Sequence, residues 1–358
     1  MSPAPSSRST AGSYAGCCRK GAPPLKRFAG IAVALGVVGL ISALALWVLP
    51  ADAFVFEPGN AKPLGERVQV EGARPEGEGD IYYVDVLVRR TSRLEDLFPF
   101  LLPDDSTVVP EVEVLPAGTT EAERDRQTAA DMQRSELVAS AVALRELGYD
   151  VEAVPKGALV IGIASDVPAA GKVKAGDVIV AVDGVQVRTP DELRSEIGKR
   201  KPGAPVALTV LRDDKRIDVQ TRTVASPVDP SRPIIGIRVD QEADIDLPID
   251  IDIDLGRVGG PSAGLAFALE IARMLGRDVT KGCRVAATGE LALDGSVLSV
   301  GGLKQKTVGA RETGVDLFLV PAGENAADAR DHAEDLEIVP VESFQQAFRE
   351  LATSARKC

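Results

Sequence analysis

The 358-residue chain has little of the chemistry that most hydrolases and metalloproteins use. It contains one histidine, His332, and four cysteines, at positions 17, 18, 283 and 358. One imidazole excludes any site that needs two, and His332 lies in a charged stretch that is typical of a surface. The cysteine spacing fits neither a zinc site nor a dense disulfide framework, and leaves open whether Cys283 and Cys358 pair. We therefore expect no metal and no cofactor.

The chain also lacks an excess of basic residues. Lys and Arg number 41 against 53 Asp and Glu, which gives a formal net charge of −12. Proteins that neutralise phosphate backbones have the opposite balance, so nucleic acid is not an expected partner. Many acidic residues lie at 240–254, where Asp alternates with Ile. This period of two is typical of a half-buried strand with Ile249, Ile251 and Ile253 facing a core, and it argues against a cation site.

One long uncharged run, at 28–49, reaches the roughly 20 residues that span a bilayer as a helix. Five basic residues and no acidic residue precede it, so the positive-inside rule predicts a cytoplasmic tail at 1–27. We expect a single-pass protein of the cell membrane, with everything after the transmembrane helix outside the cytoplasm. The alternative is a cleaved signal peptide, because Ala51-Asp52-Ala53 has the form of a cleavage site, although such apolar regions are usually about 7–15 residues long.

Residues 50–148 mix turn-rich and regular segments. Residues 52–80 are rich in Pro, Gly and Glu, whereas 81–90 have the β-branched and aromatic composition of a strand. Residues 121–147 contain no Pro and precede Gly148, which predicts a helix with a C-terminal stop. We expect an extracytoplasmic juxtamembrane region with one strand and one helix, in a structural role.

Residues 150–225 have the local signals of a small β domain. Asp183-Gly184 separates two β-branched runs as the turn of a hairpin does, and Thr189-Pro190 is typical of the start of a helix. The stretch GALVIGIASDVPAAGKVKAGDVIVAVDGVQVRTPDELRSEI resembles a PDZ domain of the bacterial protease-associated kind, mostly β with capping helices. Three prolines within residues 226–233 predict a linker after it.

The PDZ resemblance implies a groove between a strand at 160–164 and the helix at 190–197. An extended peptide would add there as a further strand and contact Leu159, Val160, Ile161 and Ile163. The alternative is a PDZ-shaped spacer whose groove only packs against its neighbours.

Two later stretches carry candidate catalytic residues. In GGPSAGLAFALEIARML, at 259–275, Ser262 lies between a Gly-Gly-Pro turn and an apolar helix. The start of a helix favours negative charge, as in an oxyanion, but from this stretch alone the favoured interpretation is that Ser262 is an ordinary N-cap. Lys306 follows 44 residues later, in a stretch that begins at residue 285. A serine needs a base, and without a suitable histidine the candidate is a lysine kept neutral by burial.

Together these stretches resemble the proteolytic domain of Lon-type serine peptidases. The matching motifs are GPSAG at 260–264, TGE at 288–290 and GGLKQK at 301–306, and the resemblance covers residues 234–358. It implies an α+β domain in which Ser262 is the acylated nucleophile, Lys306 the general base and then acid, and Thr288 a residue that orients the lysine amine. Lys304 is expected to be solvated.

Two departures from that family bear on function. Many ATP-dependent Lon enzymes carry an acidic residue three positions before the serine, where this chain has Gly259. The chain also has no GxxxxGK[ST] phosphate loop, so the activity is not expected to need ATP.

Over nearly its whole length, this multi-domain chain resembles the membrane-anchored PDZ and Lon-domain peptidases of Gram-positive bacteria. We predict an ATP-independent serine endopeptidase that cleaves extracytoplasmic proteins or peptides, with the PDZ domain selecting substrates. The alternative is a non-catalytic membrane protein that binds peptides or acts as a scaffold. Lon-like domains commonly assemble into hexameric rings, so the resemblance also implies a homo-oligomer.

Overall fold

The computed structural model describes residues 25–74, 78–115, 120–164, 166–227, 229–256 and 258–353. The chain divides into two compact units, one of Met1–Ala51 with Ser92–Pro99 and one of Asp52–Thr91 with Phe100–Cys358. Of the cytoplasmic tail expected at 1–27, residues 1–24 lie outside the described residues.

The first unit contains helices α1 (Leu25–Val48) and α2 (Arg93–Leu97). The side chains of Ser92 and Glu95 form a capping box at the start of α2, and the Arg93 N–H donates to the Leu49 carbonyl. The expected transmembrane segment, 28–49, falls on α1, where the side chains of residues 28–30 and 32 are outside the described part. Within the described ranges, no helix combines the length and the apolar character needed to cross a membrane.

The second unit is built on a six-stranded sheet with the strand order β18-β17-β14-β3-β1-β4. Strands β3, β14, β17 and β18 pair in parallel, and β4 pairs antiparallel with β1. The bounds are β1 (Pro50–Pro63), β3 (Asp80–Ser92), β4 (Thr107–Pro110), β14 (Arg284–Ala287), β17 (Leu317–Pro321) and β18 (Glu337–Val341). Half of this sheet therefore comes from residues before 111.

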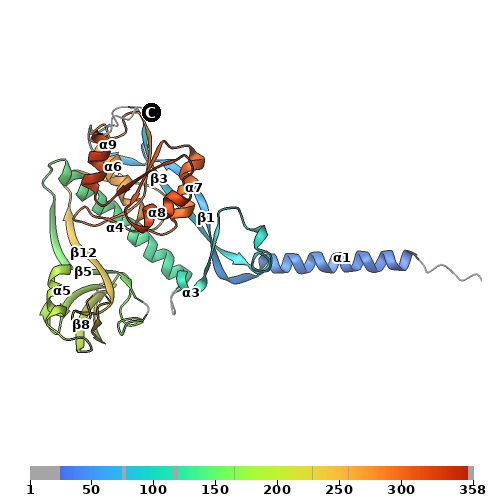
Figure 1. Cartoon of the computed structure of the whole chain (residues 1–358), viewed down its shortest axis with the longest axis horizontal. Helices are drawn as coiled ribbons and strands as arrows, with labels where there is room; N and C mark the ends of the chain where they lie inside the picture. The colour runs from blue at the N-terminus through green and yellow to red at the C-terminus, as the bar shows by residue number, and fades with distance from the viewer. Residues whose placement is uncertain are drawn as a thin grey trace, which may run out of the picture. The chain divides into compact units, whose positions relative to one another are not determined.

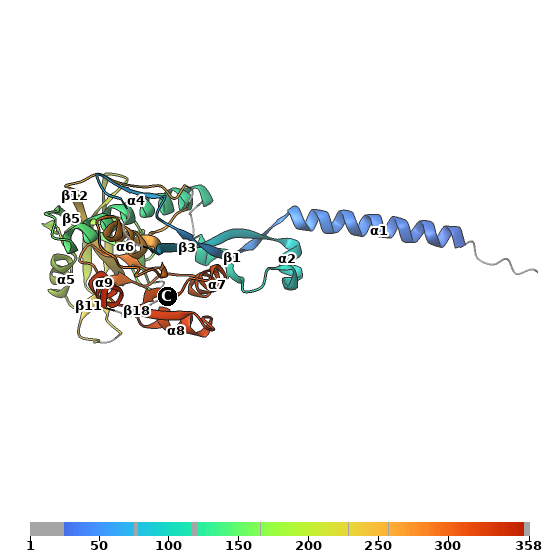
Figure 2. The same cartoon turned by 90° about the horizontal axis from the view of Figure 1, so that it is seen from above.

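Helices cover both faces of this sheet (Figures 1 and 2). Because strand side chains alternate in direction, neighbouring residues such as Tyr82 and Tyr83 enter different cores. The face that includes Tyr83 packs against α4 (Glu121–Glu146), α6 (Gly264–Met274) and α9 (Phe344–Thr353). The face that includes Tyr82 packs against α7 (Leu303–Thr313) and α8 (Glu324–Asp331). Every residue of α6 is buried, which makes it the central helix of its layer.

Residues 52–148 belong to this sheet and its cores, rather than to the separate juxtamembrane region that we expected. Besides β1, β3 and β4, they supply β2 (Val68–Val70), which pairs with β13 (Ile251–Ile253), and α4, which packs on α6. The strand predicted at 81–90 and the helix predicted at 121–147 are confirmed as β3 and α4. The sequence did not indicate that β3 pairs with β14 or that α4 packs on α6, because both of these partners lie more than 100 residues further along the chain.

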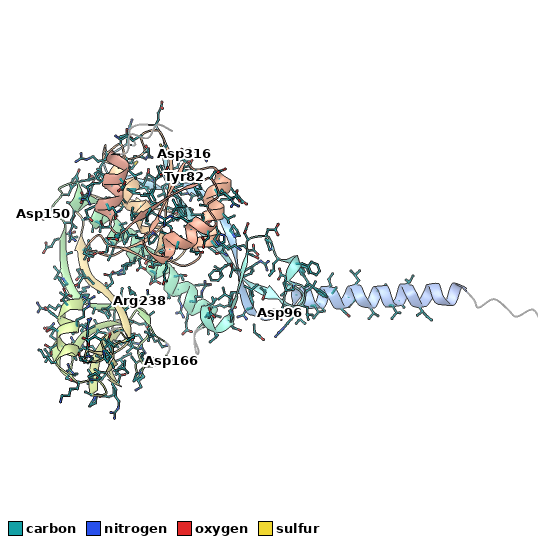
Figure 3. All side chains as sticks on the ribbon, in the orientation of Figure 1. Tyr82, Asp96, Asp150, Asp166, Arg238 and Asp316 are labelled. Carbon is teal, nitrogen blue, oxygen red and sulfur yellow. The ribbon has the colours of Figure 1, made fainter. Side chains whose placement is uncertain are left out.

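The predicted PDZ domain interrupts this fold between α4 and β13. Its strand order is β12-β5-β6-β8-β9, with β7 on β6 and helix α5 (Pro190–Gly198) packed beside them. Asp183 and Gly184 have φ angles of 48° and 80°, which confirms the predicted hairpin turn. The strands are β5 (Glu152–Ile163), β6 (Val178–Val182), β7 (Val185–Gln186), β8 (Pro205–Arg212), β9 (Lys215–Arg222) and β12 (Ile237–Asp246). Figure 3 shows the side chains of the described residues on the ribbon of the whole chain.

This sheet continues past residue 225, so the expected linker at 226–233 lies inside the domain. The last residue of the expected linker begins strand β11 (Pro233–Ile234), which pairs with β10 (Val224–Ala225). The alternating stretch at 240–254 then forms two strands, β12 and β13, instead of one. Ile249, Ile251 and Ile253 pack against the core as predicted.

Candidate active site

Three polar side chains from distant segments meet where β14 ends. Thr288 directly follows β14, Ser262 lies in a 3₁₀ turn (Pro261–Ala263) that leads into α6, and Lys306 lies in the first turn of α7. Helices α6 and α7 cover opposite faces of the sheet. Side chains at their N-terminal ends can meet only beyond the strand that separates them, so the end of β14 sets the position of the site.

A short chain of hydrogen bonds connects the three residues. Lys306 Nζ lies 2.6 Å from Ser262 Oγ and 2.9 Å from Thr288 Oγ1. The Thr288 hydroxyl donates to the Ser262 carbonyl at 3.1 Å, and the Gly289 N–H donates to the same carbonyl at 2.8 Å. A neutral lysine amine can therefore donate to Thr288 while its lone pair accepts the proton of Ser262.

Burial gives Lys306 the electrostatic character of a base. Its exposed fraction is 3%, and desolvation lowers its pKa to about 7, while the charge of Asp85 opposes this shift. Asp85 in turn pairs with Lys62, with 2.6 Å between Oδ2 and Nζ. The neutral amine is thus populated near neutral pH, where an ordinary lysine is almost fully protonated.

Glycines allow the backbone to approach closely around Ser262. Gly260 has a φ angle of 92°, in the region that glycine adopts without strain. A Cβ on Gly264 would lie 3.2 Å from the Leu291 nitrogen, and the Leu265 N–H donates to the Gly289 carbonyl at 3.0 Å. The start of α6 is thereby held against the segment that follows Thr288.

The N-cap interpretation of Ser262 is wrong. The N-cap of α6 is Ala263, and within the part of the chain that the structure describes neither the 3₁₀ turn nor α6 has a side-chain cap hydrogen bond. The Ser262 hydroxyl instead contacts Lys306.

Lys304, expected to be solvated, forms a partly exposed ion pair with Asp105 at 3.6 Å. Across the described ranges, no group of His, Cys, Asp and Glu is arranged to hold a metal ion.

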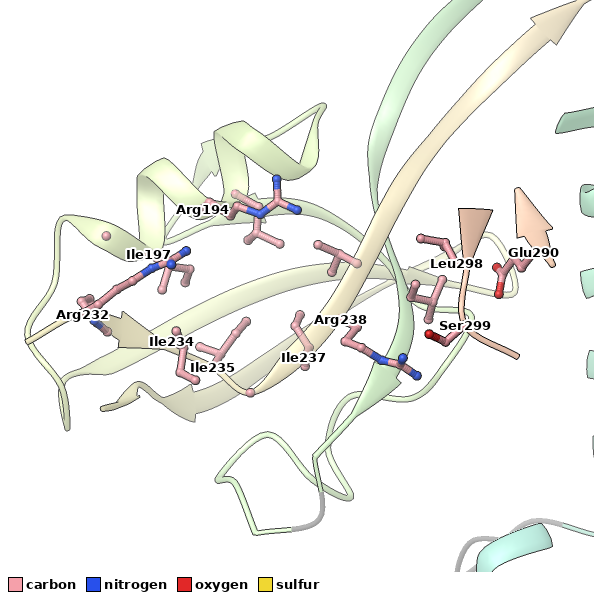
Figure 4. Close-up of a pocket in the computed structure, with 16 residues that line it drawn as sticks. Arg194, Ile197, Arg232, Ile234, Ile235, Ile237, Arg238, Glu290, Leu298 and Ser299 are labelled. Atoms are coloured by element: carbon pink, nitrogen blue, oxygen red, sulfur yellow. The ribbon is translucent and has the colours of Figure 1, made fainter. Parts of the chain in front are cut away.

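A cavity beside helix α5 corresponds only in part to the groove predicted for the PDZ domain. A cavity of about 510 Å³ lies between α5 and residues 232–239, and Glu290, Leu298 and Ser299 also line it (Figure 4). Of the four residues predicted to contact a peptide, Ile161 lines this cavity, whereas Val160 is fully buried in the core of the domain. Leu159 and Ile163 are not among its lining residues.

The strand order explains the difference. Strand β5 lies inside the sheet, between β12 and β6, whereas β12 is an edge strand and lies beside the cavity. Only an edge strand has unpaired backbone groups to which an extended peptide can add. The signal in the sequence was the apolar run IIGIRV at 234–239, which we assigned to the start of the following domain.

Comparisons with known proteins agree with both resemblances. Residues 237–353 match the family model of the Lon protease (S16) C-terminal proteolytic domain, and residues 146–223 match that of the PDZ domain. The chain contains a Lon-type serine peptidase domain. The Lon match begins at β12, although the structure shows that residues 52–148 complete the same sheet.

Relatives match this Lon-type domain over a small part of their own length. The Lon protease of Mesomycoplasma hyopneumoniae is 37% identical over 92 residues, which cover 25% of this chain and 10% of the relative. The mitochondrial Lon protease homolog of Rattus norvegicus is 41% identical over 95 residues, again 25% and 10%. The chain therefore spans about a tenth of the length of these curated relatives.

Two solved structures are similar to the PDZ domain. Both are PDZ domains of SdrC-like proteins from Listeria. The one from Listeria monocytogenes is 28% identical, covers 25% of this chain and 92% of its own, and has a TM-score of 0.23. The one from Listeria innocua is 30% identical, covers 23% and 92%, and has a TM-score of 0.22.

Proposed function

We propose that this protein is a serine endopeptidase that uses Ser262 as nucleophile and Lys306 as general base. The observation that carries the proposal is the 2.6 Å contact between Ser262 Oγ and the buried Lys306 amine, whose pKa burial lowers to about 7. A neutral lysine amine can take the proton of a serine hydroxyl, as the histidine does in a Ser-His-Asp triad.

The reaction follows from these contacts. The Lys306 amine takes the Ser262 proton while Oγ bonds to the scissile carbonyl carbon, and the ammonium then gives that proton to the leaving amine. In the second half of the reaction the same amine takes a proton from a water molecule, whose oxygen bonds to the acyl carbon. The ammonium then gives this proton to Ser262 Oγ as the acyl bond to Oγ breaks. Thr288 accepts a hydrogen bond from the amine and thus keeps its lone pair directed at Oγ in each step.

The PDZ domain, in this proposal, presents the substrate. The open edge of β12 and the apolar wall of α5 suit an extended peptide, which makes protein or peptide substrates the expected class. ATP is not required, because the sequence carries no phosphate loop to bind it. A homo-oligomeric assembly is proposed on the resemblance to Lon-like domains.

The proposed location is the cell membrane, with α1 as the anchor and the peptidase outside the cytoplasm. The uncharged run at 28–49 and the preceding basic residues support this, as do exposed apolar side chains on α1 such as Leu40, Ile41 and Leu44. Cys283 is disulfide-bonded, and such bonds persist in oxidising compartments. Alkaline extraction of membranes tests it, since an anchored protein stays with the pellet and a cleaved one is shed with a lower mass.

The catalytic proposal is tested by incubating the purified full chain, without ATP, with a loosely folded protein such as casein. We expect Ser262→Ala and Lys306→Ala to abolish cleavage, and Lys304→Ala, which changes the neighbouring lysine of the same motif, to retain it. Cleavage that survives in either of the first two variants contradicts the dyad. A parent protein that is folded but inert would favour the scaffold alternative.

A further inference from the structure

Helix α4 contacts the turn that carries Ser262. The Thr128 carbonyl accepts a hydrogen bond from the Gly260 N–H at 2.8 Å, and the Ser135 hydroxyl donates to the Pro261 carbonyl at 3.0 Å. Thr128 and Ser135 are seven residues apart, which places them on one face of the helix, two turns from each other. One helix face thus holds the two residues that immediately precede Ser262.

This contact is partly buried and closely packed. Ser135 is 3% exposed, and a Cβ on Gly264 would lie 2.9 Å from its hydroxyl oxygen. A Cβ on Gly259 would lie 3.0 Å from Thr128 Oγ1. Glycine at 259 and at 264 therefore lets α4 approach the turn, and an acidic side chain at 259 would have to displace Thr128.

The contact at the Pro261 carbonyl affects the direction in which the Ser262 side chain points. The Pro261 carbonyl and the Ser262 nitrogen belong to one peptide group, which is planar. Fixing the carbonyl fixes the plane from which the Ser262 side chain projects. The next peptide group is held at the Ser262 carbonyl by Thr288 and Gly289. Both peptide planes that flank Ser262 are thereby anchored, one by α4 and one by the segment after β14.

We infer that Ser135 is a positioning residue for Ser262: its hydroxyl orients the 261–262 peptide so that Oγ stays within reach of Lys306. The inference rests on the proposed dyad. Ser135 acts through the turn, so its loss is expected to lower the rate of the chemical step and to leave substrate binding unchanged. A misplacement of about 1 Å in a reacting group can cost on the order of 100-fold in rate.

The chain offers a matched control in the same helix. Ser140 is also 3% exposed, but its hydroxyl donates to the Glu136 carbonyl of its own helix. Ser135→Ala and Ser140→Ala therefore remove the same group at the same burial, and only the first removes a contact with the turn. Both are made in the full chain and assayed at a temperature at which circular dichroism shows each to be folded.

Three quantities are measured: kcat and KM for a fluorogenic peptide, and the rate of covalent labelling by a serine-directed fluorophosphonate. We expect Ser135→Ala to lower kcat and the labelling rate about tenfold or more at unchanged KM, and Ser140→Ala to retain all three. Equal kcat and labelling rates in the two variants overturn the inference, and so does a change confined to KM.

The dyad variants separate this result from the proposed function. If Ser262→Ala remains active and unlabelled, the proposed function fails and the positioning role with it. If Ser262→Ala is inactive while the two serine variants behave alike, only the inference about Ser135 fails.

Discussion

At the scale of single residues, two threonines in or beside the site differ in what their hydroxyl groups contact. Thr288 is 1% exposed, and its hydroxyl accepts from Lys306 and donates to the Ser262 carbonyl. Thr307, which follows Lys306, is fully buried, and its hydroxyl has no hydrogen-bond partner among the described residues. The hydroxyl at position 288 thus orients the general base, whereas the hydroxyl at position 307 forms no hydrogen bond with the described residues.

Replacing each threonine by the isosteric valine separates these roles. Thr288→Val removes the acceptor that orients the lysine amine, so we expect kcat to fall about tenfold or more. Thr307→Val removes a buried hydroxyl without a partner, so activity should be kept and the melting temperature should stay equal or rise. Steady-state kinetics and thermal melts of both variants check this. Equal losses of kcat would argue against a role for Thr288 beyond packing.

The pH dependence of the reaction also belongs to single residues. A base with a pKa of about 7 predicts that kcat/KM rises with pH through neutrality. The negative charge of Asp85 favours the ammonium, so Asp85→Asn should lower the pKa of Lys306 and move this rise to lower pH. Lys62→Met removes the cation beside Asp85 and should move it to higher pH. Profiles between about pH 5 and 9 check both signs, and shifts in one common direction would contradict this account.

At the scale of elements, helix α4 combines three kinds of contact. It packs on α6, it holds the turn before Ser262, and its Arg134 pairs with Asp240 and Glu242 of β12. The absence of Pro from residues 121–147 and the Gly148 that follows them made it predictable as a helix. Its function was not predictable, because all three contacts involve residues more than 100 positions later.

Helix α4 also carries a carboxyl group that predicts pH-dependent stability. Burial, and then the charges of Asp252 and Asp254, raise the pKa of Glu136 from 4.5 to about 7. The folded chain therefore holds a proton that the unfolded chain has released, so its stability falls as the pH rises from about 4.5 to 7. We expect Glu136→Gln to raise the melting temperature more at pH 8 than at pH 4. The exposed Glu146→Gln on the same helix should show no such difference.

The cavity between α5 and residues 232–239 predicts where peptides bind. Ile234 lines the cavity beside α5, whereas Val185, 50% exposed, lies on a hairpin away from it. We expect Ile234→Asp to raise KM for a protein substrate several-fold at unchanged kcat, because a charge disfavours an apolar groove. Val185→Asp is the control and should leave KM unchanged. An unchanged KM in Ile234→Asp would support a PDZ domain that acts only as a spacer.

At the scale of the whole molecule, the Lon-type fold is assembled from two separated parts of the chain. Residues 52–148 provide β1, β3, β4 and α4, and residues after 246 provide β14, β17, β18 and the helices α6 to α9. The PDZ domain lies between them in sequence. Neither part has a complete sheet alone, because β14 pairs with β3 on one side and with β17 on the other.

This assembly predicts which fragments fold. A fragment of residues 234–358, which contains the whole Lon match at 237–353, should be insoluble or molten, because it lacks β3 and the helix that covers α6. The fragment 52–358 should give a cooperative thermal transition. Circular dichroism and limited proteolysis of the two fragments check this, and a cooperatively folded 234–358 would contradict it.

The sequence by itself determined the local features: the hairpin at Asp183-Gly184, helices α4 and α5, and the motifs containing Ser262, Thr288 and Lys306. These depend on turn chemistry, capping and residue spacing, all of which operate within a few residues. Only the tertiary structure decided that residues 52–148 complete the Lon-type sheet, that β12 rather than β5 is the edge strand beside the groove, and that Ser135 holds the turn before Ser262. Strand pairing and helix packing join residues far apart in the chain, and one segment's composition does not specify its partner.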